Sequence, residues 1–254
     1  FTFQASEKTY MTFEFTIKNK GGHSSEPRKD NAIYELAKAL SHLESYHFPV
    51  RYNDITLNSF KQAAQMYPET ISKAMRTFSE DPTNQQASDM LINVPLLVGM
   101  TRTTCVATML KAGHAENALA QTATATVNCR VFPEVSQSEV EAQLHKVVAN
   151  DNLEIKSLGQ PTASPVLPVM PEVLNKVTKT VHAIYPKVPV FTYMSAFATD
   201  GKESRLAGIP TYGVSAVFYG EDGGNAHGLN ENLSKKEFLN SLDYWYMLLK
   251  ELAH

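Results

Sequence analysis

Hydrophobic and polar residues alternate near the start of the chain, and this pattern predicts a strand over residues 8–18. Apolar side chains occupy every second position, which places them on one face of that strand: Met11, Phe13, Phe15 and Ile17. Gly21 and Gly22 end the strand. Residues 31–43 then repeat apolar positions at helical spacing, with Asp30 or Asn31 available as the N-cap. The chain therefore opens with a strand, a turn and a helix.

Residues 48–98 interrupt this simple pattern. Their apolar spacing predicts short helices over 60–67, 68–79 and 87–97, and a segment rich in Pro, Asn and Gln breaks the pattern at 81–86. We interpret residues 48–98 as a helical insertion.

The pattern after the insertion completes a compact unit. β-Branched residues predict strands over 101–110 and 122–132, followed by a helix over 136–148 and a short strand over 153–158. The order strand, helix, strand, strand, helix, strand is the split β-α-β-β-α-β arrangement, in which a four-stranded antiparallel sheet packs against two helices. We therefore predict an α+β, ferredoxin-like domain over residues 1–159.

A proline-rich linker over residues 160–170 leads into a second unit, residues 160–254. Strands and helices alternate along it, as in an α/β fold. The predicted helices are 172–185, 202–206 and 234–252, and the predicted strands are 190–194 and 211–218. These strands are few for an independent parallel sheet, and the chain does not start with Met, so we expect it to be part of a longer protein.

Composition narrows the class of protein. The 254 residues are 43% hydrophobic, which suits a globular fold, and the net charge of −3 comes from dispersed charges without the basic surface that nucleic acid requires. No stretch of 18 apolar residues predicts a membrane segment, and the first residues lack a signal-peptide pattern.

The two cysteines, Cys105 and Cys129, each lie in a predicted strand. They are too few for a disulfide framework or a cysteine-based zinc site. Small buried free thiols are the favoured interpretation, and a pair on neighbouring strands is the alternative.

His23 is the first candidate for chemistry. It lies in the segment Lys-Gly-Gly-His-Ser-Ser, residues 20–25, between the predicted strand and helix. A histidine held on such a turn can reach outward to a reaction centre. The alternative is a surface histidine in a turn that merely caps the helix through Ser24 or Ser25.

Two more candidates lie in the second unit. His227 follows a glycine-rich loop, and a neutral imidazole there can bind zinc. A loop histidine that simply lies beside Asp222 or Glu231 is the alternative. The dipeptide Thr199-Asp200 precedes a predicted helix, so it is either an N-cap or a substrate-binding turn.

Six blocks of sequence occur together in a recognisable order. They are Lys-Gly-Gly-His-Ser-Ser (20–25), Gly-x-x-x-Asn-Ala-Leu-Ala (113–120), Ala-Thr-Val-Asn-Cys-Arg-Val-Phe-Pro (125–133), Thr-Asp (199–200), Gly-Ile-Pro-Thr-Tyr-Gly (208–213) and Ala-His-Gly-Leu-Asn-Glu (226–231). This order resembles the aminoacylase/carboxypeptidase superfamily of two-zinc metallopeptidases, which includes glutamate carboxypeptidase, acetylornithine deacetylase and succinyl-diaminopimelate desuccinylase. The insertion and the Thr-Arg-Thr-Thr segment at 101–104 look closest to its carboxypeptidase S-like branch.

The resemblance implies an arrangement of domains. Residues 8–158 match the family's lid or dimerisation domain, and residues 160–254 match the C-terminal portion of its α/β zinc-binding catalytic domain. The N-terminal portion, which carries most zinc ligands and the general base, has no counterpart in this sequence. Only His227 matches a zinc ligand, so we expect two zinc ions in the intact parent and no stable zinc binding by this fragment.

The resemblance also implies roles for individual residues. His23 matches a lid histidine that reaches across a dimer to polarise the scissile carbonyl. Asn117 and Arg130 match lid residues that hold the substrate carboxylate, although an exposed strand arginine is the alternative for Arg130. Thr199 and Asp200 match a turn that lines the substrate pocket.

A function follows from the resemblance as an expectation. The parent would be a zinc-dependent metallopeptidase or amidohydrolase of the carboxypeptidase or aminoacylase type. It would form a homodimer through the lid domain and cleave an amide next to a free carboxylate in a peptide or N-acyl amino acid. We expect the fragment alone to be inactive, and the alternative is a non-catalytic dimerisation or binding module.

Overall fold

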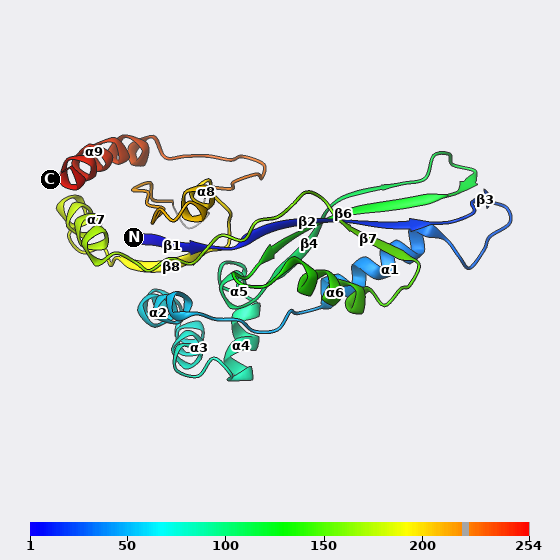
Figure 1. Ribbon diagram of the computed structural model, residues 1–254, viewed down its shortest axis with the longest axis horizontal. Helices are drawn as coiled ribbons and strands as arrows, with labels where there is room; N and C mark the ends of the chain where they lie inside the picture. Colours follow the sequence, from blue (N-terminus) through cyan, green and yellow to red (C-terminus); the bar gives the residue numbers. More distant parts are fainter. Residues whose placement is uncertain (220–223, 254) are drawn as a thin grey trace.

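The computed structural model describes residues 1–219 and 224–253. A long four-stranded sheet extends away from a part that contains the C-terminal helices (Figure 1). Among the described helices, none combines the length and the apolar content that crossing a bilayer requires.

The long sheet contains β2 (Thr9–Lys18), β4 (Thr104–Ala112), β6 (Thr122–Val131) and β7 (Leu153–Ser157). Its strand order is β4-β6-β2-β7, and every neighbouring pair is antiparallel. This is the predicted α+β arrangement with a four-stranded antiparallel sheet, which the structure confirms. We call this sheet with its two covering helices the lid.

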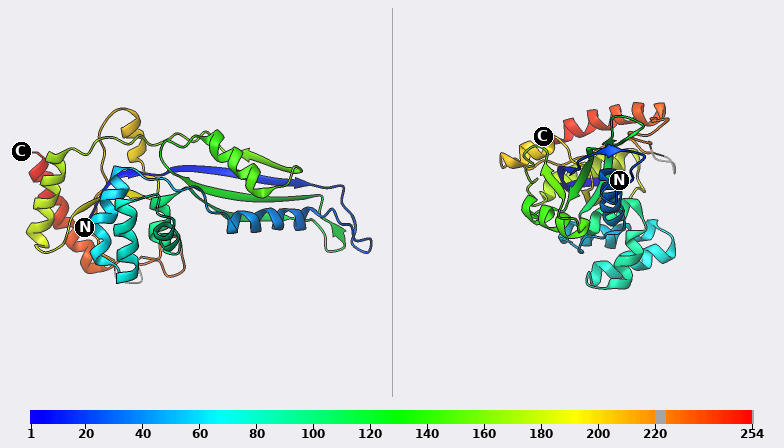
Figure 2. Two further views of the ribbon diagram at one scale, coloured as in Figure 1. Left: turned by 90° about the horizontal axis from the view of Figure 1, so that it is seen from below. Right: turned by 90° about the vertical axis from the view of Figure 1, so that its right-hand side faces the viewer.

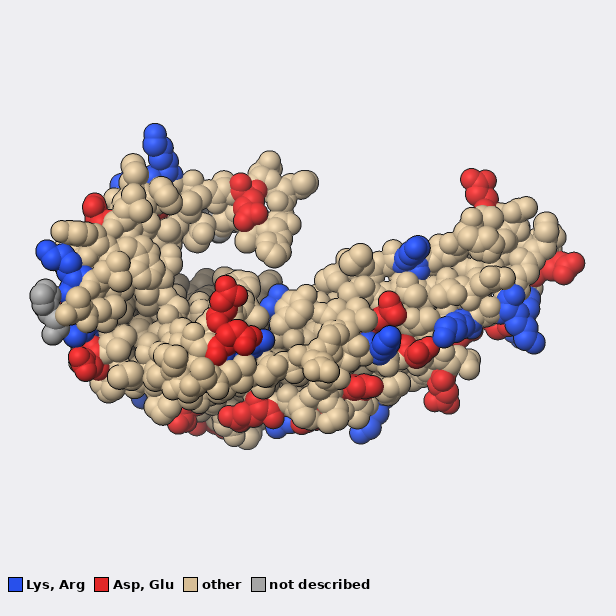
Figure 3. All heavy atoms as spheres, turned by 45° about the horizontal axis from the view of Figure 1, so that its top comes forward, with Lys and Arg blue, Asp and Glu red and all other residues tan. Residues whose placement is uncertain are grey.

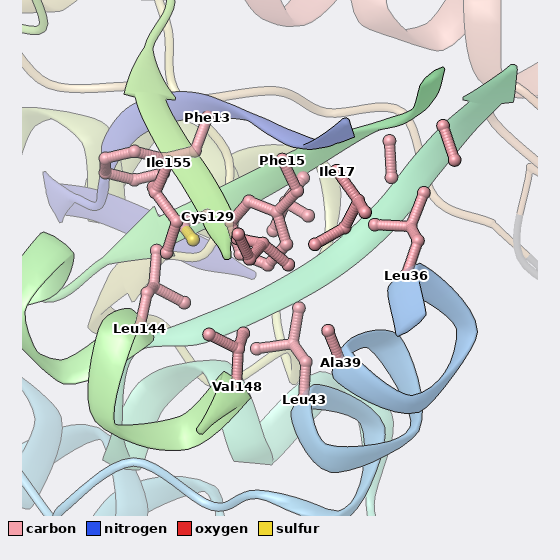
Figure 4. Packing of buried hydrophobic residues seen from close by; sticks show 14 of the residues in the cluster. Phe13, Phe15, Ile17, Leu36, Ala39, Leu43, Cys129, Leu144, Val148 and Ile155 are labelled. Atoms are coloured by element: carbon pink, nitrogen blue, oxygen red, sulfur yellow. The ribbon is translucent and has the colours of Figure 1, made fainter. Parts of the chain in front are cut away.

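Helices α1 (Ala32–Ser45) and α6 (Gln137–Val148) cover one face of the lid sheet. Figure 4 shows side chains of β2 pointing toward those of the two helices, where they form one buried cluster. The caps agree with the sequence: Asn31 Oδ1 accepts the backbone N–H groups of Ile33 and Tyr34, and Ser136 accepts that of Glu139. The predicted alternation thus buries every second residue of β2.

The register of the lid sheet defines its two ends. Lys18 is opposite Thr122 at one end, and Thr9 is opposite Val131 at the other. We call the end beyond Lys18 the tip and the end at Thr9 the base. The tip also holds a two-stranded ladder formed by β3 (Gly22–His23) and β5 (Ala118–Leu119).

The insertion is helical, as predicted, but its boundaries differ. It contains α2 (Asp54–Ala63), η1 (Ala64–Met66), α3 (Glu69–Glu80), α4 (Gln85–Ile92) and α5 (Pro95–Thr101). The first helix begins at Asp54 rather than at residue 60, because Asn53 and Thr56 form a capping box there. These helices make a separate lobe (Figure 2) whose buried cluster includes Phe191 of β8 (Phe191–Ser195).

The C-terminal part is built around β8, which pairs in parallel with β1 (Thr2–Glu7). Helices α7 (Pro171–Ile184) and α9 (Lys235–Leu252) pack beside it, and α8 (Gly201–Leu206) follows β8. The boundary at residue 159 stays a prediction. The structure adds that β1, which precedes the lid, packs with the C-terminal part.

The predicted strand over 211–218 is wrong. This segment makes only an isolated bridge, in which Gly213 exchanges two backbone hydrogen bonds with Gln4. No regular ladder forms between β1 and this segment among the described residues, and the regular partner of β1 is β8.

The favoured interpretation of the cysteines as free thiols is also wrong. Cys105 and Cys129 are directly opposite each other on β4 and β6, with 4.1 Å between their Cα atoms, and they form a disulfide. The sequence placed both in strands but did not give the register that makes them partners. The bond ties the outer strand β4 to the strand that carries Arg130.

Removal of this disulfide should destabilise the lid. We expect the Cys105→Ser/Cys129→Ser double variant to lose roughly 3 kcal/mol of unfolding free energy, because the closed loop no longer restricts the unfolded chain. Urea unfolding of the oxidised chain and of the double variant measures the difference. The two single variants are unsuitable controls because each leaves a free thiol; reduced wild-type chain is the matched one. Equal midpoints for oxidised and reduced chain would contradict the prediction.

Candidate functional site

The tip of the lid brings His23 and Asn117 together. His23 is paired with Ala118 in the β3–β5 ladder, and the Ser24 N–H donates to the Asn117 carbonyl at 3.0 Å. Gly21 permits this turn: its φ is +72°, and a Cβ there would lie 2.7 Å from the Gln121 side chain. Two segments that are distant in sequence thus form one candidate site, which the sequence blocks alone did not place in contact.

The His23 ring is exposed and is held on one side only. Its Nδ1 atom accepts the Ser25 N–H at 3.2 Å and lies 2.8 Å from Ser25 Oγ. Neither serine caps the following helix, because Asn31 does. The alternative in which this turn merely caps the helix is therefore wrong.

A second group of candidate residues surrounds a cavity of about 350 Å³ at the base of the lid. Lys8 and Tyr10 line it from the lid side, and Thr199 and Asp200 line it from the turn before α8. Residues 160–162 of the linker close a further wall. The structure thus brings two of the predicted substrate-binding residues to one cavity.

Lys8 is fully buried beside this cavity. Its ammonium group donates to the Arg102 carbonyl at 2.5 Å. Burial, together with the nearby Arg130 and Arg102 guanidinium groups, lowers the pKa of Lys8 to about 7. Lys8 therefore changes its charge near neutral pH and is a cation whose hydrogen-bond partner is a neutral carbonyl oxygen.

Arg130 lies on β6 next to Tyr10, its register partner on β2. Its guanidinium carbon is 4.6 Å from the centre of the Tyr10 ring, and its Nε donates to Asn128 Oδ1 at 3.1 Å. The contacts found among the described residues involve neither Nη1 nor Nη2 of Arg130. These two groups form the part of the guanidinium that can bind a carboxylate in a fork.

A buried polar network fixes the turn at Thr199. Its hydroxyl donates to Glu7 Oε2 at 2.6 Å, and Glu7 Oε1 lies 2.5 Å from Arg205 Nη2 as an ion pair without the alignment of a hydrogen bond. Arg205 also donates to Ser164 Oγ at 3.0 Å and to the Thr211 carbonyl at 2.8 Å. The Thr199 hydroxyl is thus engaged by the protein, while Asp200 is exposed at the cavity.

Within one chain the tip and the base do not meet. Strand β6 connects them with ten residues, which span about 30 Å at about 3.4 Å per residue. Asn117 therefore lies beside His23, and Arg130 lies beside Tyr10 at the opposite end of the lid. The two residues that the resemblance assigns to the substrate carboxylate are not neighbours in a single chain.

His227 lies in the exposed loop before α9, and Figure 1 shows that α9 and this loop are far from β3 at the tip. Its backbone N–H donates to Glu231 Oε2 at 3.3 Å, and Asp222, its other suggested neighbour, lies outside the described residues. In the part of the chain that the structure describes, no three His, Cys, Asp or Glu side chains gather to hold a metal ion. His227 can contribute one ligand, and a zinc site needs more.

Lys8, Glu7 and Arg205 were missed by the sequence reasoning. Lys8 follows Glu7 between two strands, a position that suggests an exposed charge pair rather than burial. Arg205 lies in a six-residue helix that offers no periodic signal. Tertiary packing buries these charges: β1 packs with the C-terminal part, and Lys8 also contacts the Arg102 carbonyl beyond α5.

Charged side chains of both signs are interspersed over the face drawn in Figure 3. The same face is hollowed beneath the arm formed by α9 and the loop before it. A ligand that binds this face would therefore meet individual charged side chains of either sign rather than a broad patch of one sign.

Comparisons with known proteins agree with this geometry. Residues 5–156 match the family model described as "Peptidase dimerisation domain" (M20_dimer). The N-fatty-acyl-amino acid synthase/hydrolase PM20D1 of Xenopus tropicalis is 26% identical, with 96% of this chain and 48% of that protein covered. The probable carboxypeptidase S-like 2 of Dictyostelium discoideum is 24% identical, with 96% and 47% covered. The chain thus spans about half the length of these relatives.

Solved structures share the fold. The M20 family metallo-carboxypeptidase Sso-CP2 of Sulfolobus solfataricus has a TM-score of 0.62 at 20% identity, with 98% of this chain and 59% of that chain covered. The di-peptidase Dug1p of Saccharomyces cerevisiae has a TM-score of 0.66 at 11% identity, with 98% and 55% covered. The predicted family, including relatives of the carboxypeptidase S-like branch, is confirmed.

The buried Lys8 should make stability depend on pH. Between pH about 7 and 10 the unfolded chain holds a proton on Lys8 that the folded chain has released, so the unfolding free energy should rise with pH by up to about 1.4 kcal/mol per unit. Lys8→Met should remove this rise and be the more stable protein at pH about 6. Urea unfolding at several pH values measures both effects.

The control for this experiment is Lys111→Met, because Lys111 is exposed on β4. Its pH profile should run parallel to that of the wild type. Parallel profiles for Lys8→Met and the wild type would mean that Lys8 titrates alike in the folded and unfolded states, against the prediction.

Proposed function

Because the chain belongs to the M20 peptidase family through its peptidase dimerisation domain, we propose that it forms the lid and the C-terminal catalytic segment of a longer zinc-dependent hydrolase. The reaction is hydrolysis of an amide next to a free carboxylate, in a peptide or an N-acyl amino acid. The names of two relatives, a fatty-acyl-amino acid hydrolase and a carboxypeptidase S-like protein, support this class of substrate.

The cavity at the base of the lid is the observation that carries this proposal. Lys8 and Tyr10 line it, Arg130 stacks on the Tyr10 ring, and the acid Glu7 is already paired with Arg205. A substrate carboxylate bound here would supply the negative charge that favours the ammonium form of Lys8, and it could accept hydrogen bonds from the Nη groups of Arg130. The proposal assigns the substrate's carboxylate end to this cavity.

His23 and Asn117 act on the other end of the scissile amide in this proposal. The exposed imidazole at the tip donates a hydrogen bond to the carbonyl oxygen, where negative charge develops during attack by water. Asn117 is held beside His23 by its backbone contact with Ser24, so its amide can orient the same substrate. His23 lies on the short ladder at the tip of the lid and Asn117 directly precedes its second strand, so both can approach a site formed by another chain.

Zinc would supply polarisation of the carbonyl and activation of water in such an enzyme. The described residues do not fit a complete zinc site, since no three of their His, Cys, Asp or Glu side chains gather around His227 or elsewhere. We therefore derive no step through zinc from this chain, and we assign the remaining ligands to the rest of the longer protein. On this proposal the chain alone binds zinc weakly and is inactive.

A homodimer would bring tip and base together. The outer strand β4 carries apolar side chains that are 59%, 68% and 67% exposed, those of Val106, Met109 and Leu110. A long outer strand with exposed apolar residues is suited to pairing with a second copy. In a two-fold dimer of this kind, the tip of each lid serves the base of its partner.

The test of the proposed carboxylate site is Arg130→Ala in the longer protein. We expect kcat/KM for an N-acyl amino acid to fall by about 10- to 100-fold, because a charge-assisted hydrogen bond is worth about 1.5–3 kcal/mol. Arg130→Lys should recover part of the loss, since it keeps the charge but not the fork. Steady-state kinetics with the acid and with its primary-amide analogue measure whether the loss is specific for the carboxylate.

Arg76→Ala provides the matched control, because Arg76 is an exposed arginine paired with Glu69 on the insertion. It should leave kcat/KM unchanged. The present chain with added zinc serves as the blank and should hydrolyse neither substrate. An equal loss of acid and amide hydrolysis in Arg130→Ala would remove Arg130 from carboxylate binding.

A further inference from the structure

Ser25 is the residue that engages the ring of His23. The turn from His23 to Glu26 is closed by the Glu26 N–H, which donates to the His23 carbonyl at 3.0 Å. Inside this turn, the Ser25 N–H points at Nδ1 of His23 from 3.2 Å, and Ser25 Oγ lies 2.8 Å from the same nitrogen. Two groups of one residue therefore contact one nitrogen of the imidazole.

The chemistry of these groups decides where the ring proton lies. A backbone N–H can only donate, so Nδ1 must be the acceptor and cannot carry a proton. The Ser25 hydroxyl, next to the same unprotonated nitrogen, then also donates to it. In a neutral imidazole one nitrogen carries the proton, and here that nitrogen is Nε2.

We propose that Ser25 is a positioning residue that holds His23 in the Nε2–H tautomer, so that Nε2–H is presented outward as a hydrogen-bond donor to the substrate carbonyl oxygen. The role of Nε2–H as a donor to the substrate rests on the proposed function, whereas the tautomer follows from the contacts of Ser25 alone. Within the described part of the chain, the ring contacts found for His23 all involve Nδ1, so Nε2 stays available. A histidine with the opposite tautomer would present a lone pair there and could not stabilise an oxyanion.

The tautomer can be measured on this chain by ¹⁵N nuclear magnetic resonance. At pH about 8.5, where an ordinary imidazole is neutral, long-range ¹H–¹⁵N correlations distinguish protonated from unprotonated ring nitrogens. The His23 signals are assigned by their loss in His23→Gln. For His23 we expect an unprotonated Nδ1 and a protonated Nε2. The fraction of this tautomer should be higher than in His114, an exposed loop histidine that serves as the internal reference. A protonated Nδ1, or a tautomer mixture equal to that of His114, would overturn the proposal.

Variants at the two adjacent serines separate the role of Ser25 from general effects of the turn. Ser25→Ala removes the hydroxyl, which makes the shorter contact at 2.8 Å, and leaves only the backbone N–H at 3.2 Å. The preference for Nε2–H should therefore weaken, and the His23 nitrogen shifts should move toward a mixture of tautomers. Ser25→Thr retains both donors and should restore the wild-type shifts. Ser24→Ala is the matched control, since Ser24 contacts Asn117 through its backbone. Wild-type shifts in Ser25→Ala would overturn the role of the side chain.

Kinetics in the longer protein complete the test. Ser25→Ala should lower kcat and leave KM nearly unchanged. The fall in kcat should be smaller than the roughly 100-fold that loss of an oxyanion donor costs. Ser25→Thr should recover kcat. An unchanged kcat in Ser25→Ala would overturn the positioning role. If instead His23→Gln is fully active, the proposed function of His23 fails while the measured tautomer stands, so the two failures are distinguishable.

Discussion

The buried ion pair between Glu7 and Arg205 is the interaction on which the cavity at the base of the lid depends. It joins the end of β1 to α8, and the same carboxylate accepts the Thr199 hydroxyl. Removing either charge would leave the other uncompensated in the interior, which is strongly unfavourable. The turn at 199–200 is therefore fixed relative to β1. Because Lys8 follows Glu7 directly, the same constraint places its ammonium group beside that turn.

Much of the lid could be predicted from the sequence, because its elements carry local signals. The alternation in β2 and the caps at Asn31 and Ser136 are confirmed, since short-range patterning and capping decide those elements. The strand predicted over 211–218 failed because β-branched composition cannot supply a pairing partner. The cysteine pair was missed for the related reason that register is a property of two strands.

In the candidate site, too, the sequence predicted individual residues but not their contacts. Sequence blocks identified His23, Asn117, Arg130, Thr199, Asp200 and His227, but they gave no indication of which residues are neighbours. The structure groups His23 with Asn117 at the tip, and Thr199 and Asp200 with Lys8 and Tyr10 at the base. Lys8 and Ser25 escaped prediction because their roles arise from burial and from a turn geometry. Because the two groups lie at opposite ends of one lid, a site that uses both groups would need residues from two chains.

In the proposed dimer, the tip of one chain and the base of another form one site. The decisive experiment mixes two impaired variants of the longer protein, His23→Ala and Arg130→Ala. In a mixed two-fold dimer, one site would carry both defects and the other would carry none. After subunit exchange at equal ratio, we expect recovery of about a quarter of wild-type activity, since half of the dimers are mixed and each has one intact site. If mixed dimers are demonstrated by mass and activity still stays at the level of the separate variants, the tip and the base of different chains do not form one site.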